Sequence, residues 1–245
     1  QFLESRLPFP VDRQQVERLN RQLEGWPSAL QLIALLANDE ESFNRHTQEF
    51  AQGHSHLIDY LNEEVWAQTP ASTQRFLLRS SILERFNEPL LGALTGEPHP
   101  QAVLEQIERQ GLFITPQDSS RSWYRYHPLF ANFLQHRLHL DHPEEERSLH
   151  QTASDAWMTL GFPHEAVQHA IAANDSERII TLLLREGWLF YQQGQLRILQ
   201  QCLDALTPEQ IANNAELTLL QAWTAQSQFD ATRVETYLQA AEQVL

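Results

Sequence analysis

A chain of 245 residues with 42% hydrophobic content can form one large domain or two to three small ones, each with its own core. All 17 basic residues are arginine, which excludes a phosphate-loop lysine, a Schiff-base lysine and a lysine general base from this chain. No apolar run approaches the roughly 20 residues that span a bilayer, and no basic-then-apolar leader opens the chain. The single cysteine, Cys202, fits a reducing compartment. We therefore expect a cytoplasmic protein without membrane contact.

The net charge of −15 is spread unevenly along the chain. It sums to −6 over residues 1–71, to +1 over residues 72–140 and to −10 over residues 141–245. Because nucleic-acid binding scales with the number of phosphates that basic side chains neutralise, both ends are poor candidates for a DNA-binding surface. The middle third is a weak candidate for the same reason.

The first 70 residues are predicted to form a helical segment. Apolar residues recur at helical spacing over residues 11–24, and residues 28–37 are so strongly apolar that we expect a buried helix. A break at residues 25–27 separates these two helices. A third helix is predicted over residues 57–68, and Pro70 marks the boundary to the next domain.

Residues 71–141 follow the element order of a winged helix. Three short helices are predicted first: one that Ser72 and Thr73 cap and that carries Phe76, Leu77 and Ile82, and two more over residues 88–94 and 101–110. Two β-prone runs, 112–115 and 123–126, flank a polar loop and predict a hairpin. A further helix is expected from Pro128 to about Leu140.

The hairpin meets this last helix at Tyr126, His127 and Pro128. Pro128 fixes its own φ for a first helical turn and favours an extended conformation for His127. His127 is therefore predicted at a helix N-terminus, where backbone N–H groups and the helix dipole favour a phosphate or another anion. Alternation along the strand places Arg125 on the same face as His127. The alternative is an ordinary, partly buried histidine paired with a backbone carbonyl.

Residues 142–245 are predicted to form helical hairpins throughout. Turn signals recur at residues 161–163, 194 and 207–208, and the resulting period of roughly 35 to 40 residues is typical of a tetratricopeptide-like array. No polar capping helix closes the array, so we expect it to continue beyond this chain. The tryptophans of the tail are interpreted as hairpin core in preference to a ligand cage; they are Trp157, Trp188 and Trp223. The predicted fold is thus mainly α: helical segment (1–70), winged helix with a short β-hairpin (71–141) and helical repeats (142–245).

Several stretches resemble the STAND family of signalling ATPases. Residues 25–30, Gly-Trp-Pro-Ser-Ala-Leu, resemble the motif that closes the family's nucleotide-binding module, and residues 126–130, Tyr-His-Pro-Leu-Phe, resemble the histidine motif of its winged-helix domain. The helical tail resembles the start of its repeat sensor. Further stretches are similar to the MalT-like, LuxR-type transcription regulators within this family; they are residues 24–26, 29–35, 107–113 and 220–223. Together the resemblance spans almost the whole chain.

The resemblance implies which residues contact a nucleotide. In this family the proline of the first motif packs near the adenine, and the winged-helix histidine reaches the β-phosphate of ADP. The matching residues here are Pro27 and His127, with Gly25 and Arg125 beside them. The implied function is the regulatory part of an ATP- and ADP-dependent transcription activator. Its winged helix would hold ADP in the inactive state, and its repeats would transmit the signal of a small-molecule effector, for which a sugar is one candidate.

The departures from the family are equally clear. This chain contains no phosphate loop, no Walker B segment and no C-terminal helix-turn-helix. We therefore expect it to bind ADP poorly, to hold no cofactor tightly and to catalyse no reaction by itself. The longer protein would be a slow signalling ATPase that self-associates on activation and contacts DNA and RNA polymerase through its C-terminal domain. No catalytic set stands out, and His136, His139 and His142 recur without completing a metal site.

Two other functions stay open at this stage. The helical repeats could form a protein-interaction scaffold that needs no nucleotide. The winged helix could bind DNA directly, although the near-neutral charge of residues 72–140 argues against this alternative.

Overall fold

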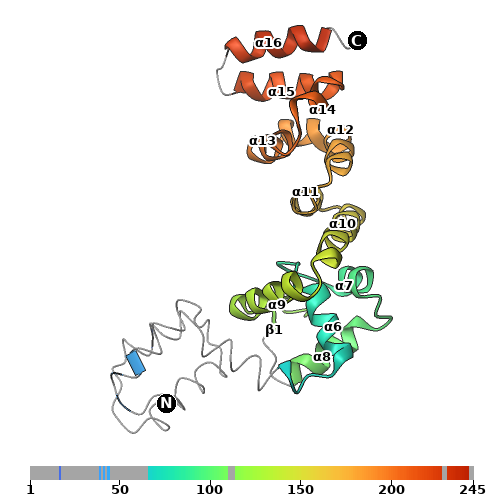
Figure 1. The fold of residues 1–245 in the computed structure, drawn as a ribbon, viewed down its shortest axis with the longest axis vertical. Helices are drawn as coiled ribbons and strands as arrows, with labels where there is room; N and C mark the ends of the chain where they lie inside the picture. Colours follow the sequence, from blue (N-terminus) through green and yellow to red (C-terminus); the bar gives the residue numbers. More distant parts are fainter. Residues whose placement is uncertain are drawn as a thin grey trace. The chain divides into compact units, whose positions relative to one another are not determined.

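The computed structural model describes residues 66–109, 114–227 and 231–242, together with Glu17, Asp39, Glu41, Phe43 and Asn44. The chain divides into two compact units, residues 1–141 and residues 142–245 (Figure 1). Most of the predicted N-terminal helical segment, including residues 25–30, lies outside the described residues. None of the described helices is long and apolar enough to cross a membrane.

The described part of the first unit is a winged helix, as the sequence predicted. Its elements in chain order are α6 (Ala71–Ser80), α7 (Glu88–Thr95), α8 (Pro100–Arg109), β1 (Ile114–Pro116), β2 (Tyr124–Tyr126) and α9 (Pro128–Asp141). The two ends of α7 are set by local interactions. The side chain of Asn87 accepts a hydrogen bond from the backbone N–H of Leu90, and Gly96 ends the helix with a φ of 71°.

The predicted cap of the first helix is wrong. Helix α6 begins at Ala71, with Pro70 at the N-cap position and no capping hydrogen bond from a described side chain. Thr73 is buried inside the helix, and Ile82 lies beyond its end at Ser80, although Ile82 is buried as well. Pro70, with an extended ψ of 144°, leads directly into the helix, so Ser72 and Thr73 lie inside the first turn instead of at the N-cap.

Strand β2 is paired along both of its edges. Antiparallel pairing with β1 sets Ile114 opposite Tyr126 and Pro116 opposite Tyr124. On the other edge Phe86, which precedes α7, forms a bridge with Tyr124 through two backbone hydrogen bonds of 2.8 and 2.9 Å. The sequence did not predict this third partner. It gives the short hairpin a central strand rather than an open edge.

Aromatic side chains from separate elements form the core of this unit. Tyr126 lies 4.7 Å from Phe86 and 5.8 Å from Phe130 between ring centroids, and all three are almost fully buried. The phenol of Tyr126 also forms a 2.7 Å hydrogen bond with the hydroxyl of Ser80 at the end of α6. A buried hydroxyl needs such a partner. The contact therefore ties α6 to β2 at a fixed position.

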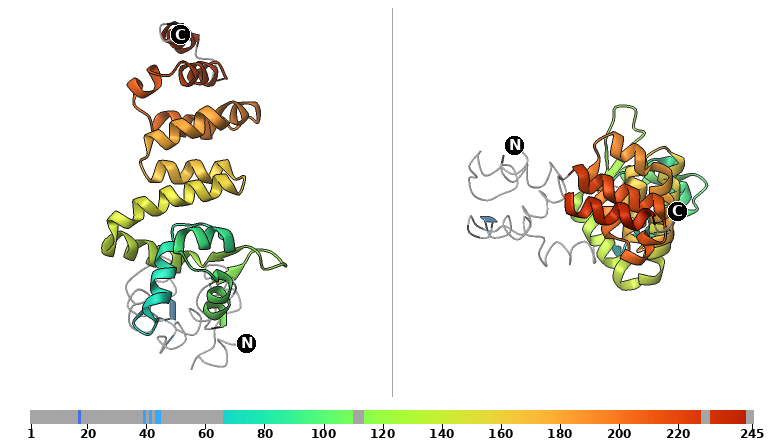
Figure 2. Two further views of the ribbon diagram at one scale, coloured as in Figure 1. Left: turned by 90° about the vertical axis from the view of Figure 1, so that its right-hand side faces the viewer. Right: turned by 90° about the horizontal axis from the view of Figure 1, so that it is seen from above.

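The described part of the second unit is entirely helical. Its elements are α10 (Pro143–Thr159), α11 (Pro163–Ala172), α12 (Ser176–Gln192), α13 (Leu196–Asp204), α14 (Pro208–Ala212), α15 (Ala215–Ser227) and α16 (Ala231–Glu242). Figure 2 shows these helices stacked one layer upon another. The prediction of successive helical hairpins is thus confirmed. The five-residue helix α14 was predicted only as a turn, although Thr207 and Gln210 form a capping box there.

Three turns of this unit use the same hydrogen-bonding pattern. After α10, α11 and α12 the chain passes through a left-handed residue: Gly161, Asn174 and Gly194, with φ values of 79°, 50° and 71°. In each, two backbone N–H groups bond back to the last helical turn, as in Phe162 to Trp157 at 2.9 Å. The glycines were recognised from the sequence, and Asn174 was not.

Tryptophan burial differs along the repeats. Trp157 is 1% exposed and belongs to the core, as predicted, but Trp223 is 47% exposed, so its assignment to the core is wrong. Its ring lies edge-on to Trp188 at 6.4 Å and to Tyr191 at 5.7 Å. The helical period places Trp223 near an apolar stripe but cannot say which edge of that stripe faces solvent.

Gly187 on α12 allows close packing against α15, and its substitution gives a test of this arrangement. A Cβ added there would lie 2.7 Å from Cδ1 of the fully buried Leu220. We predict that Gly187→Ala lowers the free energy of unfolding in urea by about 1–3 kcal/mol, because an overpacked core strains its neighbours. Gly92→Ala on α7 is the matched control, since its nearest neighbour, Cγ of Pro100, is 3.9 Å away.

The control should move stability in the opposite direction. Alanine is the better helix former, so Gly92→Ala is expected to raise the free energy of unfolding by about 0.5–1 kcal/mol. Equal stabilisation by both substitutions would contradict the close α12–α15 contact.

Candidate functional site

The four residues that the resemblance implicates fall into two groups. Gly25 and Pro27 lie outside the described residues. Arg125 and His127 lie in the first unit, where β2 passes into α9. The structure therefore gives geometry for this second pair alone.

His127 lies immediately before the first turn of α9. The helix begins at Pro128, and the carbonyl oxygen of His127 accepts hydrogen bonds from the N–H groups of Phe130 and Ala131, both at 2.9 Å. The side chain is 6% exposed. The sequence-based placement of His127 at a helix N-terminus thus agrees with the observed start of α9. The backbone at His127 has little freedom to move, because His127 itself is buried and Phe130, in the first turn of α9, is fully buried.

Arg125 occupies the middle of β2, opposite Thr115 of β1. It is half-buried, whereas its neighbours Tyr124 and Tyr126 are buried in the core. Alternation along the strand therefore directs Arg125 away from that core, to the side that Trp123 also faces. Arg125 and His127 are two residues apart, so a guanidinium and an imidazole both belong to the short segment that joins the sheet to α9.

A second cation lies next to this segment and was not predicted. The guanidinium of Arg85 lies over the ring of Trp123, 4.8 Å from its centroid. Arg85 directly precedes Phe86, whose backbone bridges to β2. This bridge brings Arg85 from the loop before α7 to the start of the hairpin strand. Nothing in the sequence pattern marks it, because the pairing is long-range.

The middle of α9 packs against the segment that leads into the winged helix. Trp66 is 8% exposed, and its ring packs edge-on against Phe133 at 6.0 Å. The guanidinium of Arg137 lies 5.1 Å from the centroid of Trp66. The side-chain amide of Gln74 donates a 2.7 Å hydrogen bond to the carbonyl oxygen of Trp66. Helix α9 thus carries His127 at its start and holds the incoming chain along its length.

The side chains at His127 and Arg125 are of kinds that can bind an anion. A histidine ring nitrogen and an arginine guanidinium are both groups that bind phosphate oxygens. Within the described residues, no group of three or more histidine, cysteine, aspartate or glutamate side chains is placed to hold a metal ion. Cys202 is fully buried, and burial raises the pKa of its thiol to about 12, so it is no nucleophile at neutral pH.

The second unit contains a histidine pair that the sequence did not reveal. The Nδ1 atoms of His150 on α10 and His169 on α11 are 2.8 Å apart, so one ring donates and the other accepts. Burial lowers the pKa of both rings, and the nearby His150 adds to the lowering of the pKa of His169 to about 4. The two residues are 19 positions apart and meet only because α10 and α11 form a hairpin.

The fold and the comparisons agree on the class of protein. The order of three helices, hairpin and helix defines a winged-helix domain, and helical hairpins follow it in the chain. Residues 62–146 match the family model described as MalT winged helix domain. The chain is a region of a MalT-like transcriptional regulator.

The relatives of this chain are longer than the chain itself. The chain is 42% identical over 247 residues to the HTH-type transcriptional regulator MalT of Serratia proteamaculans (strain 568), covering 100% of the chain. It is 43% identical over 244 residues to the protein of the same name from Yersinia pestis (strain Pestoides F), covering 99% of the chain. In each case the chain spans 27% of the relative's length.

The histidine pair predicts how the stability of the second unit depends on pH. Both pKa values in the folded state lie below the ordinary value of 6.5, so folding favours the neutral rings. We predict that the stabilisation is complete above pH 6.5 and is lost as the pH falls toward about 4. Urea unfolding at a series of pH values measures this loss.

Two phenylalanine variants separate the pair from general acid denaturation. His169→Phe should reduce the loss of stability between pH 6.5 and 4, because the ring that resists protonation is gone. His164→Phe, at an exposed position on the same helix, should keep the loss unchanged. If both variants have the same pH dependence of stability as the parent chain, the histidine pair does not cause the loss of stability at low pH.

Proposed function

We propose that this chain is the regulatory region of a nucleotide-dependent, effector-responsive transcription activator. The winged helix helps to hold ADP in the inactive state, and the helical repeats transmit the effector signal. The single observation that carries the proposal is His127, buried and held directly before the first turn of α9.

The physical case for a phosphate ligand rests on three groups that attract or bind an anion. The start of α9 offers the positive end of a helix dipole. The imidazole of His127 adds a hydrogen-bonding group, and the guanidinium of Arg125 lies two residues away on β2. A nucleoside diphosphate carries the complementary negative charge. The remaining contacts to the nucleotide would come from Pro27 and Gly25 and from parts of the longer protein.

The link between nucleotide and signal follows from where α9 lies. The same helix carries His127 at its start and packs against Trp66 on the segment that enters the winged helix. A contact between His127 and the β-phosphate therefore couples the position of the winged helix to the nucleotide state. An effector shifts this state only if it binds the active and inactive forms with different affinity. Exchange of ADP for ATP would then permit self-association.

Direct DNA binding by this winged helix is the weaker proposal. Residues 72–140 carry a net charge of only +1, and the flanking regions are acidic. A surface that contacts DNA neutralises several phosphates, which requires a basic patch. The relatives are named HTH-type regulators, and we assign DNA contact in the longer protein to a region other than this chain.

The test uses the longer regulator and a fluorescent ADP analogue. We predict that His127→Ala speeds release of the analogue by about tenfold or more, because a charge-assisted hydrogen bond contributes about 1.5–3 kcal/mol. Transcription without effector should rise in the same variant, since the inactive state is less populated. Stopped-flow fluorescence and a reporter assay give the two readouts.

Two further variants make the test specific. His164→Ala removes an exposed histidine from the second unit and should leave ADP release unchanged. His127→Gln keeps a hydrogen-bond donor and should give an intermediate rate. The proposal is wrong if His127→Ala folds normally and releases ADP at the parental rate.

A further inference from the structure

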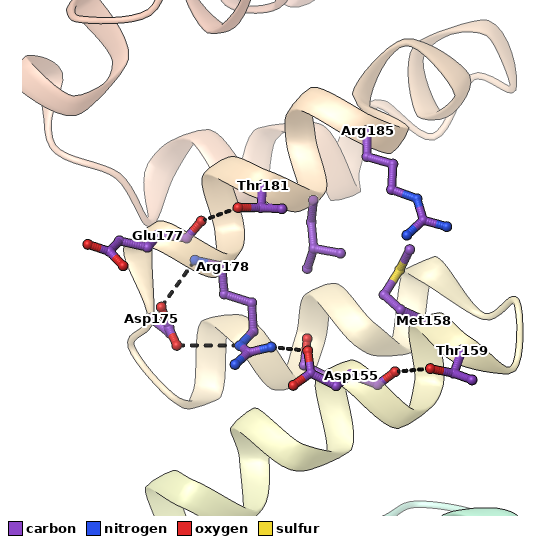
Figure 3. A pocket seen from close by; sticks show the side chains of 10 residues that line it. Asp155, Met158, Thr159, Asp175, Glu177, Arg178, Thr181 and Arg185 are labelled. Atoms are coloured by element: carbon purple, nitrogen blue, oxygen red, sulfur yellow. Dashed lines mark hydrogen bonds and ion pairs between the residues drawn. The ribbon is translucent and has the colours of Figure 1, made fainter.

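A polar groove in the second unit is separate from the nucleotide proposal. It lies between α10 and α12, has a volume of about 470 Å³ and is shown in Figure 3. Side chains of both helices line it, and several of those at the rim are exposed, including Asp155, Glu177, Thr181 and Arg185. The groove is therefore open to solvent along its rim.

One end of the groove is acidic. Arg178 forms ion pairs with Asp155 and with Asp175, and Gln151 donates a further hydrogen bond of 2.8 Å to Asp175. One arginine thus faces two carboxylates, and Glu177 adds a third. This end carries net negative charge and offers acceptors on Glu177 and Asp155, whose side chain is 67% exposed.

The other end of the groove is basic. Arg185 follows Glu177 by eight residues on α12, which corresponds to about 12 Å along a helix. Its Nε donates to Glu186 at 3.1 Å, and its side chain extends toward Met158 (Figure 3). A guanidinium has five N–H donors, so the Glu186 contact leaves several of them for a ligand. The side chain is 66% exposed and accessible.

Between the two ends the groove has an apolar floor with one polar atom. Leu182 is 4% exposed and Ser154 is 1% exposed. The hydroxyl of Ser154 lines the groove and has no hydrogen-bond partner among the described residues. A buried hydroxyl without a partner is unfavourable, so a ligand that supplies a donor or an acceptor here would be stabilised.

We propose that this groove binds an extended peptide segment of a protein partner. In the bound peptide, a basic side chain lies at the Glu177 end of the groove and a carboxylate side chain lies at the Arg185 end. A backbone amide or carbonyl of the peptide reaches Ser154. At about 3.3 Å per residue, four extended residues span the 12 Å between the ends. The acidic excess of the lining residues excludes a purely anionic ligand, and a compact neutral molecule would leave both charged ends unused.

The probe is a fluorescein-labelled eight-residue peptide of alanines with leucine at the centre. Arginine and glutamate flank the centre four positions apart, so that both side chains lie on one face of the extended peptide. Both orders along the peptide are made, because the groove does not fix the direction. Fluorescence anisotropy measures binding to the 245-residue chain. One of the two orders is expected to bind more tightly than a peptide with arginine at both positions.

Charge reversal in the groove provides the decisive comparison. Arg185→Glu should reverse the preference, so that the peptide with two arginines binds about tenfold better than before, because an attractive contact replaces a repulsive one. Arg197→Glu makes the same change in net charge at an exposed position on α13 and should leave the preference as it was. Loss of the preference in both variants, or no binding of either peptide order, would overturn the proposal.

Ser154→Ala distinguishes a ligand contact from a structural role. The substitution removes a hydroxyl without a partner among the described residues, so the free energy of unfolding should not fall. Peptide affinity should fall, because the backbone contact is lost. Unchanged affinity would contradict the proposed contact between the peptide backbone and Ser154.

Discussion

The pairing of β2 along both edges is the constraint on which the first unit depends. Tyr124 bonds to Phe86 on one side and lies opposite Pro116 of β1 on the other, while Tyr126 is packed between Phe86 and Phe130. A strand of three residues has little stability by itself. Because β2 is fixed in this way, it ends at Tyr126, and α9 begins at Pro128. The position of His127 is therefore a consequence of the packing of the core, and the proposed phosphate contact depends on that position.

Local chemistry made most of this fold predictable. Glycine and proline mark the ends of several helices, and α7, which Asn87 caps and Gly96 ends, lies close to the predicted range of residues 88–94. What the sequence could not show depends on contacts between distant residues. The bridge of Phe86 to β2, the stacking of Arg85 on Trp123 and the pairing of His150 with His169 all arise from tertiary packing. Helix α6 was misjudged because Pro70 replaced the expected polar cap. In the predicted site, the placement of His127 could be derived from the local sequence, because Pro128 constrains its own backbone and that of His127.

The two units differ in charge and in the kind of ligand they suit. The winged helix is nearly neutral, and its candidate site combines a buried histidine with an arginine and a helix N-terminus. The repeats are strongly acidic, and their groove carries opposite charges at its two ends. The proposed division of roles follows from this difference. In this proposal the winged helix would hold the phosphates of a nucleotide, and the repeats would offer a longer surface on which a partner or an effector could alter the regulator.

The central claim is that His127 contacts a nucleotide phosphate, and histidine NMR in the longer regulator tests it most directly. With 15N-labelled histidine, the signals of the His127 ring are assigned by their absence in His127→Gln. We predict that ADP shifts these signals and that adenosine, which fills the same base and sugar contacts without phosphates, does not. Equal shifts with both ligands, or no shift with ADP at a concentration that saturates the protein, would contradict the account.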